Sequence, residues 1–193
     1  DLGGTKIEAI ALHPAGHTLA RIRVPTPRHD YAATIAELCR LVGAIEHQAA
    51  MTTPAHVGLA MPGSLSPRTG LVQNANSTWL NDRPLGEDLA AALARPLRCA
   101  NDANCFALSE FEDGAGRGAH VLFGVILGTG CGGGIVHEGR LINGPRGIGG
   151  EWGHNPLPWS KPEEHPGPAC WCGRDGCLET WISGPGLAAD HER

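Results

Sequence analysis

The segment 151–179, EWGHNPLPWSKPEEHPGPACWCGRDGCLE, places the strongest constraint on what this chain can fold into. It is rich in proline and glycine and has few apolar side chains, so packing alone cannot give it a fixed shape. It carries one histidine and three cysteines: His154, Cys170, Cys172 and Cys177. Such a set is a usual tetrahedral ligand set for structural zinc. We therefore predict that a structural Zn²⁺ holds this segment together, with a disulfide or free thiols as the alternative.

Composition limits the class of protein further. The chain has 193 residues, of which 41% are hydrophobic, which suits one large domain or two small ones. A formal net charge of −5 and the absence of any lysine and arginine cluster argue against nucleic acid as a partner. No apolar run reaches the length of a membrane span, and no signal-peptide pattern opens the chain. Seven cysteines, an odd number, do not suggest a full disulfide framework, so we expect a cytoplasmic protein with no membrane partner.

Strand and helix patterns alternate along the chain. Apolar residues at helical spacing follow Asp30, which can cap a helix, and a second helix follows Pro84. A third helix is expected over 103–111, and a last helix is expected to begin near Glu179 and to break at 184–186. The expected strands are residues 7–12, 18–24, 57–61, 97–100, 121–127, 135–136 and 140–142. This order predicts a mixed α/β sheet in two successive units.

Two glycine-rich loops are candidates for binding phosphate. The first runs from Asp1 to Lys6 and reads DLGGTK. Its glycines, Gly3 and Gly4, let backbone N–H groups approach an anion, and Thr5 and Lys6 add a hydroxyl and a cation. Asp1 could orient a magnesium ion through water. A plain Gly-Gly hairpin turn is the alternative.

The second loop follows a strand-forming run and contains G-x-G-x-x-G as Gly128, Gly130 and Gly133. A dinucleotide site needs a helix directly after these glycines. The residues that follow, 135–142, predict a hairpin, which argues against a dinucleotide. We interpret the loop as a second phosphate-binding turn. Two such turns favour a nucleoside triphosphate held between two lobes.

Asn101-Asp102 closes a predicted strand. A carboxylate at a strand end is placed to accept a proton from a hydroxyl that attacks a phosphoryl group. Phosphoryl transfer depends mostly on positioning and charge neutralisation, so one base, a magnesium ion and donor loops suffice. The simpler interpretation is that Asp102 caps the helix beginning at Ala103. Glu151 and Glu179 could likewise only begin a loop and charge a helix N-terminus.

Five motifs occur in order along the chain: DLGGTK, ANDANCFA, LGTGCGGG, GGEWGH and CxCGxxGCLE. Together they resemble the ROK family of bacterial sugar kinases and repressors, and the likeness runs over the whole chain. Other segments are most similar to the fructokinase (mannofructokinase) branch of that family: PTPR at 25–28, PGSLSP at 62–67, NANSTWLN at 74–81 and EWGHNPLPW at 151–159. The combination is highly specific, although single motifs are not.

The resemblance implies an α/β, actin-like ATPase (ribonuclease H-like) fold, with ATP, its Mg²⁺ and a sugar in a cleft between two lobes. It implies that Asp102 is the base that deprotonates the attacking sugar hydroxyl. The implied sugar-binding residues are Gly63, Asn76, Asn101, Asp102, Glu151, His154 and Glu179. The implied nucleotide-binding residues are Asp1, Gly3, Gly4, Thr5, Lys6, Gly128, Thr129 and Gly130. The implied zinc ligands are His154, Cys170, Cys172 and Cys177.

The chain departs from the family pattern at both ends. Family members have a strand before the first loop and continue well past the position of Arg193. We therefore expect a fragment in which 1–115 is the small lobe and 116–193 is an incomplete large lobe. Small residues at 114–118 predict a hinge between the two.

The expected activity is ATP-dependent phosphorylation of a hexose, D-fructose to fructose 6-phosphate. The alternatives are a kinase for N-acetylglucosamine, glucose or mannose, and a sugar-sensing repressor. Repressors of this family carry a helix-turn-helix before the first loop, whereas retention of Asp102 and of both phosphate loops favours catalysis. The full-length protein is expected to be a homodimer, and the isolated fragment could be inactive.

Overall fold

The structure is a computed structural model and describes residues 1–192. It divides into two compact units, the first formed by residues 1–102 and the second beginning at Ala103. The division therefore falls ahead of the small-residue break at 114–118, where the sequence places the boundary between lobes. The assignment of residues 1–115 and 116–193 to two lobes stays a prediction.

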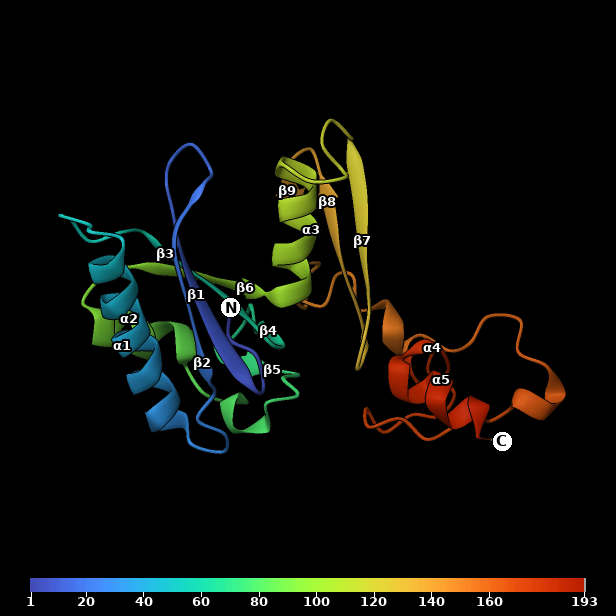
Figure 1. Ribbon diagram of the computed structural model, residues 1–193. Coiled ribbons are helices and arrows are strands. Elements are labelled where there is room, and N and C mark those ends of the chain that lie inside the picture. The colour runs from blue at the N-terminus through green and yellow to red at the C-terminus, as the bar shows by residue number, and fades with distance from the viewer. Residues whose placement is uncertain (193) are drawn as a thin grey trace. The chain divides into compact units, whose positions relative to one another are not determined.

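The first unit is built on a hairpin and a parallel strand pair (Figure 1). Strands β1 (Lys6–Leu12) and β2 (Thr18–Pro25) pair antiparallel, as the sequence predicts. Strands β3 (Val57–Met61) and β6 (Leu97–Asn101) pair parallel, with Met61 opposite Asn101. Both strands of this pair consequently end at the same edge. Two short antiparallel strands, β4 (Ser64–Leu65) and β5 (Val72–Gln73), follow β3.

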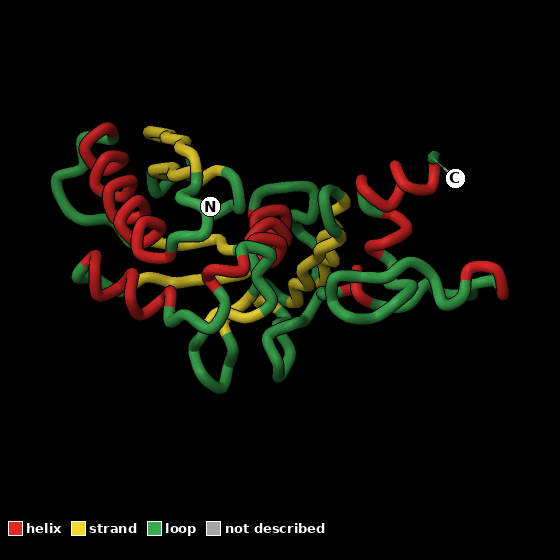
Figure 2. Tube along the Cα trace, turned by 90° about the horizontal axis from the view of Figure 1, so that it is seen from below, coloured by secondary structure: helices red, strands yellow, loops and turns green. Residues whose placement is uncertain are grey.

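Two helices cover the strands of the first unit, α1 (Tyr31–Gln48) and α2 (Leu85–Leu93), drawn in red in Figure 2. Asp30 caps α1 as predicted, because its side chain accepts a hydrogen bond from the backbone N–H of Ala33 at 2.9 Å. A short 3₁₀ turn, η1 (Thr78–Leu80), precedes α2. The buried core that these elements share consists of Leu2, Ile7, Leu38, Leu41, Leu59, Met61, Val72, Ala75, Leu80, Leu85 and Leu89.

Helix α3 (Asp102–Glu112) starts on the last residue of the first unit, and the rest of it belongs to the second. There it packs against an antiparallel sheet of β7 (Val121–Leu127), β8 (Cys131–His137) and β9 (Arg140–Leu141). The sequence analysis left residues 131–134 in a loop, but they form the first half of β8. The reason is antiparallel pairing with β7, in which Cys131 lies opposite Leu127 and Gly134 opposite Gly124. Glycine at 134 lets α3 approach the sheet, because a Cβ there would lie 2.8 Å from the Cβ of Ala107. The prediction that no helix follows G-x-G-x-x-G is confirmed, because a strand follows it.

The chain after β9 has little regular structure until its last two helices. It contains the 3₁₀ turns η2 (Trp152–His154) and η3 (Pro162–Glu164), then α4 (Glu179–Ile182) and α5 (Gly184–His191). The helix that begins at Glu179 ends at Ile182, just ahead of the predicted break at 184–186, but a further helix that was not predicted, α5, begins at Gly184. Ser183 caps α5 by accepting a hydrogen bond from the N–H of Gly186 at 3.1 Å, and proline suits the first turn of a helix. Within residues 1–192, no helix combines the length and the apolar character needed to cross a membrane.

Candidate functional site

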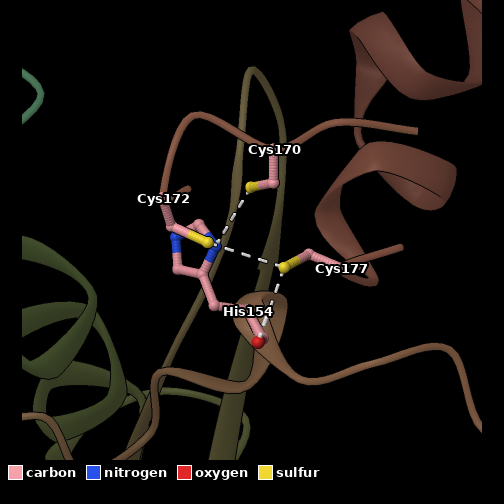
Figure 3. Close-up of side chains that lie close together, drawn as sticks. All are labelled: His154, Cys170, Cys172 and Cys177. Carbon is pink, nitrogen blue, oxygen red and sulfur yellow. Dashed lines mark hydrogen bonds between the residues drawn. The ribbon is translucent and has the colours of Figure 1, made fainter. Parts of the chain in front are cut away.

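The four predicted zinc ligands lie together in the second unit (Figure 3). The ligand atoms of His154, Cys170, Cys172 and Cys177 all lie within 4.8 Å of one another. The Sγ of Cys170 is 3.5 Å from Nδ1 of His154, and the Sγ atoms of Cys172 and Cys177 are 3.6 Å apart. The side chains therefore converge on one point from two stretches of chain.

These distances match a tetrahedral metal site. With Zn–S bonds of about 2.3 Å and a Zn–N bond of about 2.0–2.1 Å, neighbouring sulfurs lie about 3.8 Å apart, and a sulfur and a nitrogen about 3.6 Å apart. A disulfide would require sulfurs about 2.05 Å apart. All seven cysteines are free thiols, so the disulfide alternative is excluded in this structure. The chemistry of the four residues fits a closed structural zinc site.

Backbone hydrogen bonds clasp the two stretches that carry the ligands. The N–H of Leu178 donates to the carbonyl of Asn155 at 2.8 Å, and the N–H of Leu157 donates to the carbonyl of Gly176 at 3.0 Å. Residues 170–174 form a tight turn, the knuckle, in which the N–H of Cys170 donates to the carbonyl of Arg174 at 2.8 Å. Few apolar side chains in this segment are buried, so a bound ion would supply much of its rigidity.

The thiols of the cluster differ in their readiness to ionise. Burial opposes ionisation of Cys172, but hydrogen bonds from Arg174 outweigh it and lower the pKa of this thiol to about 6. Burial and hydrogen bonds with Cys172 and Cys170 raise the pKa of Cys177 to about 12. A divalent metal bound by three thiolates would therefore displace at least the proton of Cys177.

Glycines of the motif GGEWGH hold the start of this segment against β8. Gly153 is buried, and a Cβ there would lie 2.3 Å from the carbonyl oxygen of Cys131. Gly150 has a φ of +89°, and a Cβ there would lie 2.4 Å from the carbonyl oxygen of Gly133. Trp152 adds a hydrogen bond from its Nε1 to the carbonyl of Gly132 at 2.7 Å. Only glycine at positions 150 and 153 permits the chain to approach β8 this closely, and the approach fixes the position of His154.

Glu179 lies beside the second glycine turn. Its Oε2 accepts a hydrogen bond from the N–H of Cys131 at 2.9 Å, and its Oε1 accepts one from Nε1 of Trp171 at 2.7 Å. A Cβ at Gly130 would lie 2.8 Å from Oε2 of Glu179. The structure thus brings a predicted sugar-binding residue next to the predicted phosphate-binding turn. Trp171 was not among the predicted site residues, although its place between two candidate ligand cysteines could have marked it as one.

The turn itself is short and its middle residue is exposed. The N–H of Gly128 donates to the carbonyl of Gly130 at 3.0 Å, which leaves the side chain of Thr129 facing solvent. The carbonyl of Gly128 accepts a hydrogen bond from the N–H of Gly184 at 2.8 Å, which ties the turn to the start of α5. Glu151 is also exposed, directly before η2 in the same unit.

In the first unit, predicted sugar-binding residues gather where β3 and β6 end. The Nδ2 of Asn101 donates to the carbonyl of Gly63 at 2.9 Å and to Oδ1 of Asp102 at 3.1 Å. Asp102 is exposed and is the first residue of α3, a position that suits a negative charge. Carboxyl ends of parallel strands are where open α/β sheets bind ligands. The roles of base and of helix cap both remain compatible with this position.

The first glycine loop is held by a residue that the sequence analysis did not select. Thr26 is buried, its hydroxyl donates to the carbonyl of Gly3 at 2.7 Å, and its N–H donates to the carbonyl of Thr5 at 3.1 Å. The position of Thr26 between Pro25 and Pro27 could have marked it as a residue with a fixed structural role. The N–H of Gly3 donates to the carbonyl of Lys6 at 2.9 Å, and the N–H of Glu8 donates to the carbonyl of Asp1 at 2.9 Å. The loop is therefore a closed turn between Asp1 and β1.

The loop that carries Asn76 lies against this first turn. A Cβ at Gly4 would be 3.3 Å from the hydroxyl oxygen of Ser77. Asn81 fixes the loop through two hydrogen bonds with Ala75, accepting from its N–H at 2.9 Å and donating to its carbonyl at 3.0 Å. Asn76 itself is exposed. The first unit thus brings a predicted sugar-binding residue close to a predicted nucleotide-binding loop.

Comparison with known proteins assigns the chain to a class. The family model described as "ROK family" matches residues 1–193, so the chain belongs to the ROK family, which has an actin-like ATPase fold. The chain is 41% identical over 191 residues to the N-acetyl-D-glucosamine kinase of Pectobacterium atrosepticum. That match covers 97% of this chain and 62% of the relative.

Two solved structures have the same fold. The ROK hexokinase from Thermus thermophilus is 37% identical with a TM-score of 0.82, and the match covers 98% of this chain and 60% of that one. A ROK family glucokinase from Streptomyces griseus, solved with glucose and AMPPNP, is 29% identical with a TM-score of 0.77. This second match covers 97% of this chain and 57% of the glucokinase. The chain therefore spans somewhat less than two thirds of the proteins it matches.

Proposed function

We propose that the full-length protein phosphorylates a hexose with ATP as donor, and that Asp102 is the general base. The observation that carries the proposal is the position of Asp102, exposed at the carboxyl end of a parallel strand pair and joined to Asn101 at 3.1 Å. Membership of a family that contains sugar kinases supports it.

The residues of the first unit supply the two things that phosphoryl transfer requires, positioning and charge compensation. Asn101 donates a hydrogen bond to Asp102 and is itself anchored on Gly63, so the position of the carboxylate is restrained. From that position Asp102 accepts the proton of the attacking sugar hydroxyl. The first glycine loop offers backbone N–H groups, the hydroxyl of Thr5 and the ammonium of Lys6 to phosphate oxygens. Magnesium bound with ATP neutralises charge on the transferred group.

The second unit supplies the residues that hold the sugar. We propose that Glu151 and Glu179 accept hydrogen bonds from sugar hydroxyls. His154 would bind zinc through Nδ1, which faces the cysteines, and offer Nε2 to the sugar. Zinc in this scheme is structural, and its role is to fix His154 and the segment that leads to Glu179. The turn of Gly128, Thr129 and Gly130 contributes further N–H groups to phosphate.

We base the proposed sugar substrate on the similarity to relatives over the whole chain rather than on the short motifs. Motifs such as PTPR and PGSLSP favoured D-fructose, whereas the curated relatives that match over nearly the whole chain are N-acetyl-D-glucosamine kinases at 36–41% identity. Similarity over the whole chain samples more of the sugar site than four motifs do. We therefore propose N-acetyl-D-glucosamine as the first substrate, with D-glucose, D-mannose and D-fructose as competitors.

A sugar panel on the full-length protein tests this proposal. ADP release is coupled to NADH oxidation for each of the four sugars, and kcat/KM is compared at saturating ATP and magnesium. We expect N-acetyl-D-glucosamine to give the highest kcat/KM. A clear preference for D-fructose would restore the motif-based expectation. Sugar binding without ADP release would instead support the regulatory alternative.

A further inference from the structure

One large aromatic side chain in the metal-binding segment is exposed and yet held in place. Trp171 lies between the ligands Cys170 and Cys172, and 66% of its surface is accessible to solvent. Tryptophan is mostly buried in folded proteins. Its indole nonetheless makes two specific contacts. Nε1 donates to Oε1 of Glu179 at 2.7 Å, and the ring meets the ring of His154 edge to face, with centroids 4.8 Å apart and an angle of 84°.

The first contact determines how the Glu179 carboxylate is oriented. Each of its oxygens accepts one hydrogen bond, Oε2 from the backbone N–H of Cys131 and Oε1 from the indole of Trp171. The terminal torsion of a glutamate is soft, so a single donor would leave the carboxylate free to rotate. Two donors from two different segments fix its plane. An ionised carboxylate has about four acceptor sites, so oxygen lone pairs remain for hydroxyl groups of a ligand.

The second contact restrains the imidazole of His154. The edge-to-face arrangement sets the plane of the ring whose Nδ1 faces the cysteines. The same indole therefore restrains His154 and Glu179, two of the three residues in segment 151–179 that the proposed function assigns to sugar binding. Most of its ring surface stays accessible.

We propose that Trp171 is a positioning residue for hexose binding, which acts by orienting the Glu179 carboxylate and the His154 ring. This inference rests on the proposed function, because it names the residue that prepares the sugar-binding carboxylate. It differs from a purely structural role in one respect: removal of the indole N–H should weaken sugar binding while the metal-binding segment stays folded.

The test compares Trp171→Phe, which keeps an aromatic ring without the N–H, with Trp171→Leu, which removes both contacts. Trp159→Phe is the matched control, because Trp159 lies in the same segment and is 96% exposed. For each full-length variant, zinc content, the Kd for N-acetyl-D-glucosamine and the KM values for sugar and ATP are measured. A hydrogen bond to a charged group shifts an equilibrium constant by roughly tenfold, and this sets the scale of the effect on sugar affinity when the bond orients the carboxylate for the sugar. We expect Trp171→Phe to raise the Kd and KM for sugar about tenfold, without changing the zinc content or the KM for ATP.

Equal sugar affinity in wild type and Trp171→Phe would overturn the inference. Loss of zinc in Trp171→Phe would also overturn it, because the effect would then be structural. If Trp171→Leu fails to fold, Trp171→Phe alone decides. Failure of the proposed function looks different, since wild type would then phosphorylate none of the sugars. In that case the NMR chemical shift of the Trp171 indole N–H is compared between wild type and Glu179→Gln. A change in this shift still reports that the indole is hydrogen-bonded to the Glu179 carboxylate.

Discussion

Substitution of one proposed zinc ligand, Cys172→Ser, should weaken zinc binding and, through it, sugar binding. Structural zinc contributes about 10–16 kcal/mol in small zinc-binding peptides. If four ligands share this equally, one ligand carries about 2.5–4 kcal/mol, or a loss of roughly 10²- to 10³-fold in zinc affinity. The four ligand atoms already lie within 4.8 Å of one another, with 3.5 Å between the Cys170 and His154 atoms and 3.6 Å between those of Cys172 and Cys177. Little reorganisation energy therefore offsets that loss.

The loss should reach the sugar through the segment between the ligands. Without zinc, the knuckle that carries Trp171 is no longer held, so Glu179 keeps only the hydrogen bond from Cys131. One lost hydrogen bond to a carboxylate predicts a rise of about tenfold in the Kd for sugar. The amides of Leu157 and Leu178, which clasp the two stretches, should exchange faster with deuterium.

The assay measures zinc per chain by mass spectrometry, the Kd for sugar by calorimetry and amide exchange over 155–178, all on the full-length protein. Cys39→Ser, a cysteine in helix α1, is the matched control and should change none of the three. Loss of zinc with an unchanged Kd for sugar would refute the coupling. Retention of zinc by Cys172→Ser would refute the assignment of Cys172 as a ligand.

Two further predictions concern stability, measured by urea unfolding. Gly153→Ala places a Cβ 2.3 Å from the carbonyl oxygen of Cys131 and should cost about 1–3 kcal/mol, whereas Gly43→Ala, with no atom within 4 Å, should stabilise α1 by about 0.5–1 kcal/mol. Equal effects of the two substitutions would contradict the packing argument. Arg95 hydrogen-bonds Glu46 and lowers the pKa of that carboxyl below 4.5, so the pair stabilises above this pH and its contribution is lost as pH falls further. Glu46→Gln should therefore cost about 1 kcal/mol at pH 7 and progressively less below pH 4, and a constant difference across this range would argue against the ion pair.

Features that depend on neighbouring residues were predictable from the sequence. The β1–β2 hairpin and the cap at Asp30 follow from strand periodicity and from a side chain that accepts a nearby N–H. The clustering of His154, Cys170, Cys172 and Cys177 was predictable because these residue types are metal ligands, and the structure brings the four side chains together. The start of α5 was also predictable, because Ser183 is followed two residues later by Pro185, and a capping serine with a proline in the first turn is a helix-start signal. It was missed because Gly-Pro-Gly was interpreted only as a breaker.

Features that depend on distant residues were not predictable. Gly134 lies in a strand because it pairs with Gly124 of β7, and Ala107 of α3 packs against it. Nothing within the loop sequence reports either contact. The two donors that hold Glu179 come from Cys131 and Trp171, and only the folded chain places them on opposite oxygens. Sugar choice was poorly predicted for a related reason. Hexoses differ by single substituents, and short motifs do not report which residues face them.

The central claim, that Asp102 is the base of a sugar kinase, is tested most directly by Asp102→Asn in the full-length protein. The substitution keeps the shape of the side chain and one acceptor oxygen for the hydrogen bond from Asn101, but it removes the charge and the ability to accept the proton. Asp113→Asn, at an exposed position just after the same helix, is the control. We predict an unchanged Kd for N-acetyl-D-glucosamine and a fall in kcat of about 10²- to 10⁴-fold for Asp102→Asn, with wild-type turnover for the control. Turnover within a few-fold of wild type in Asp102→Asn would contradict the account.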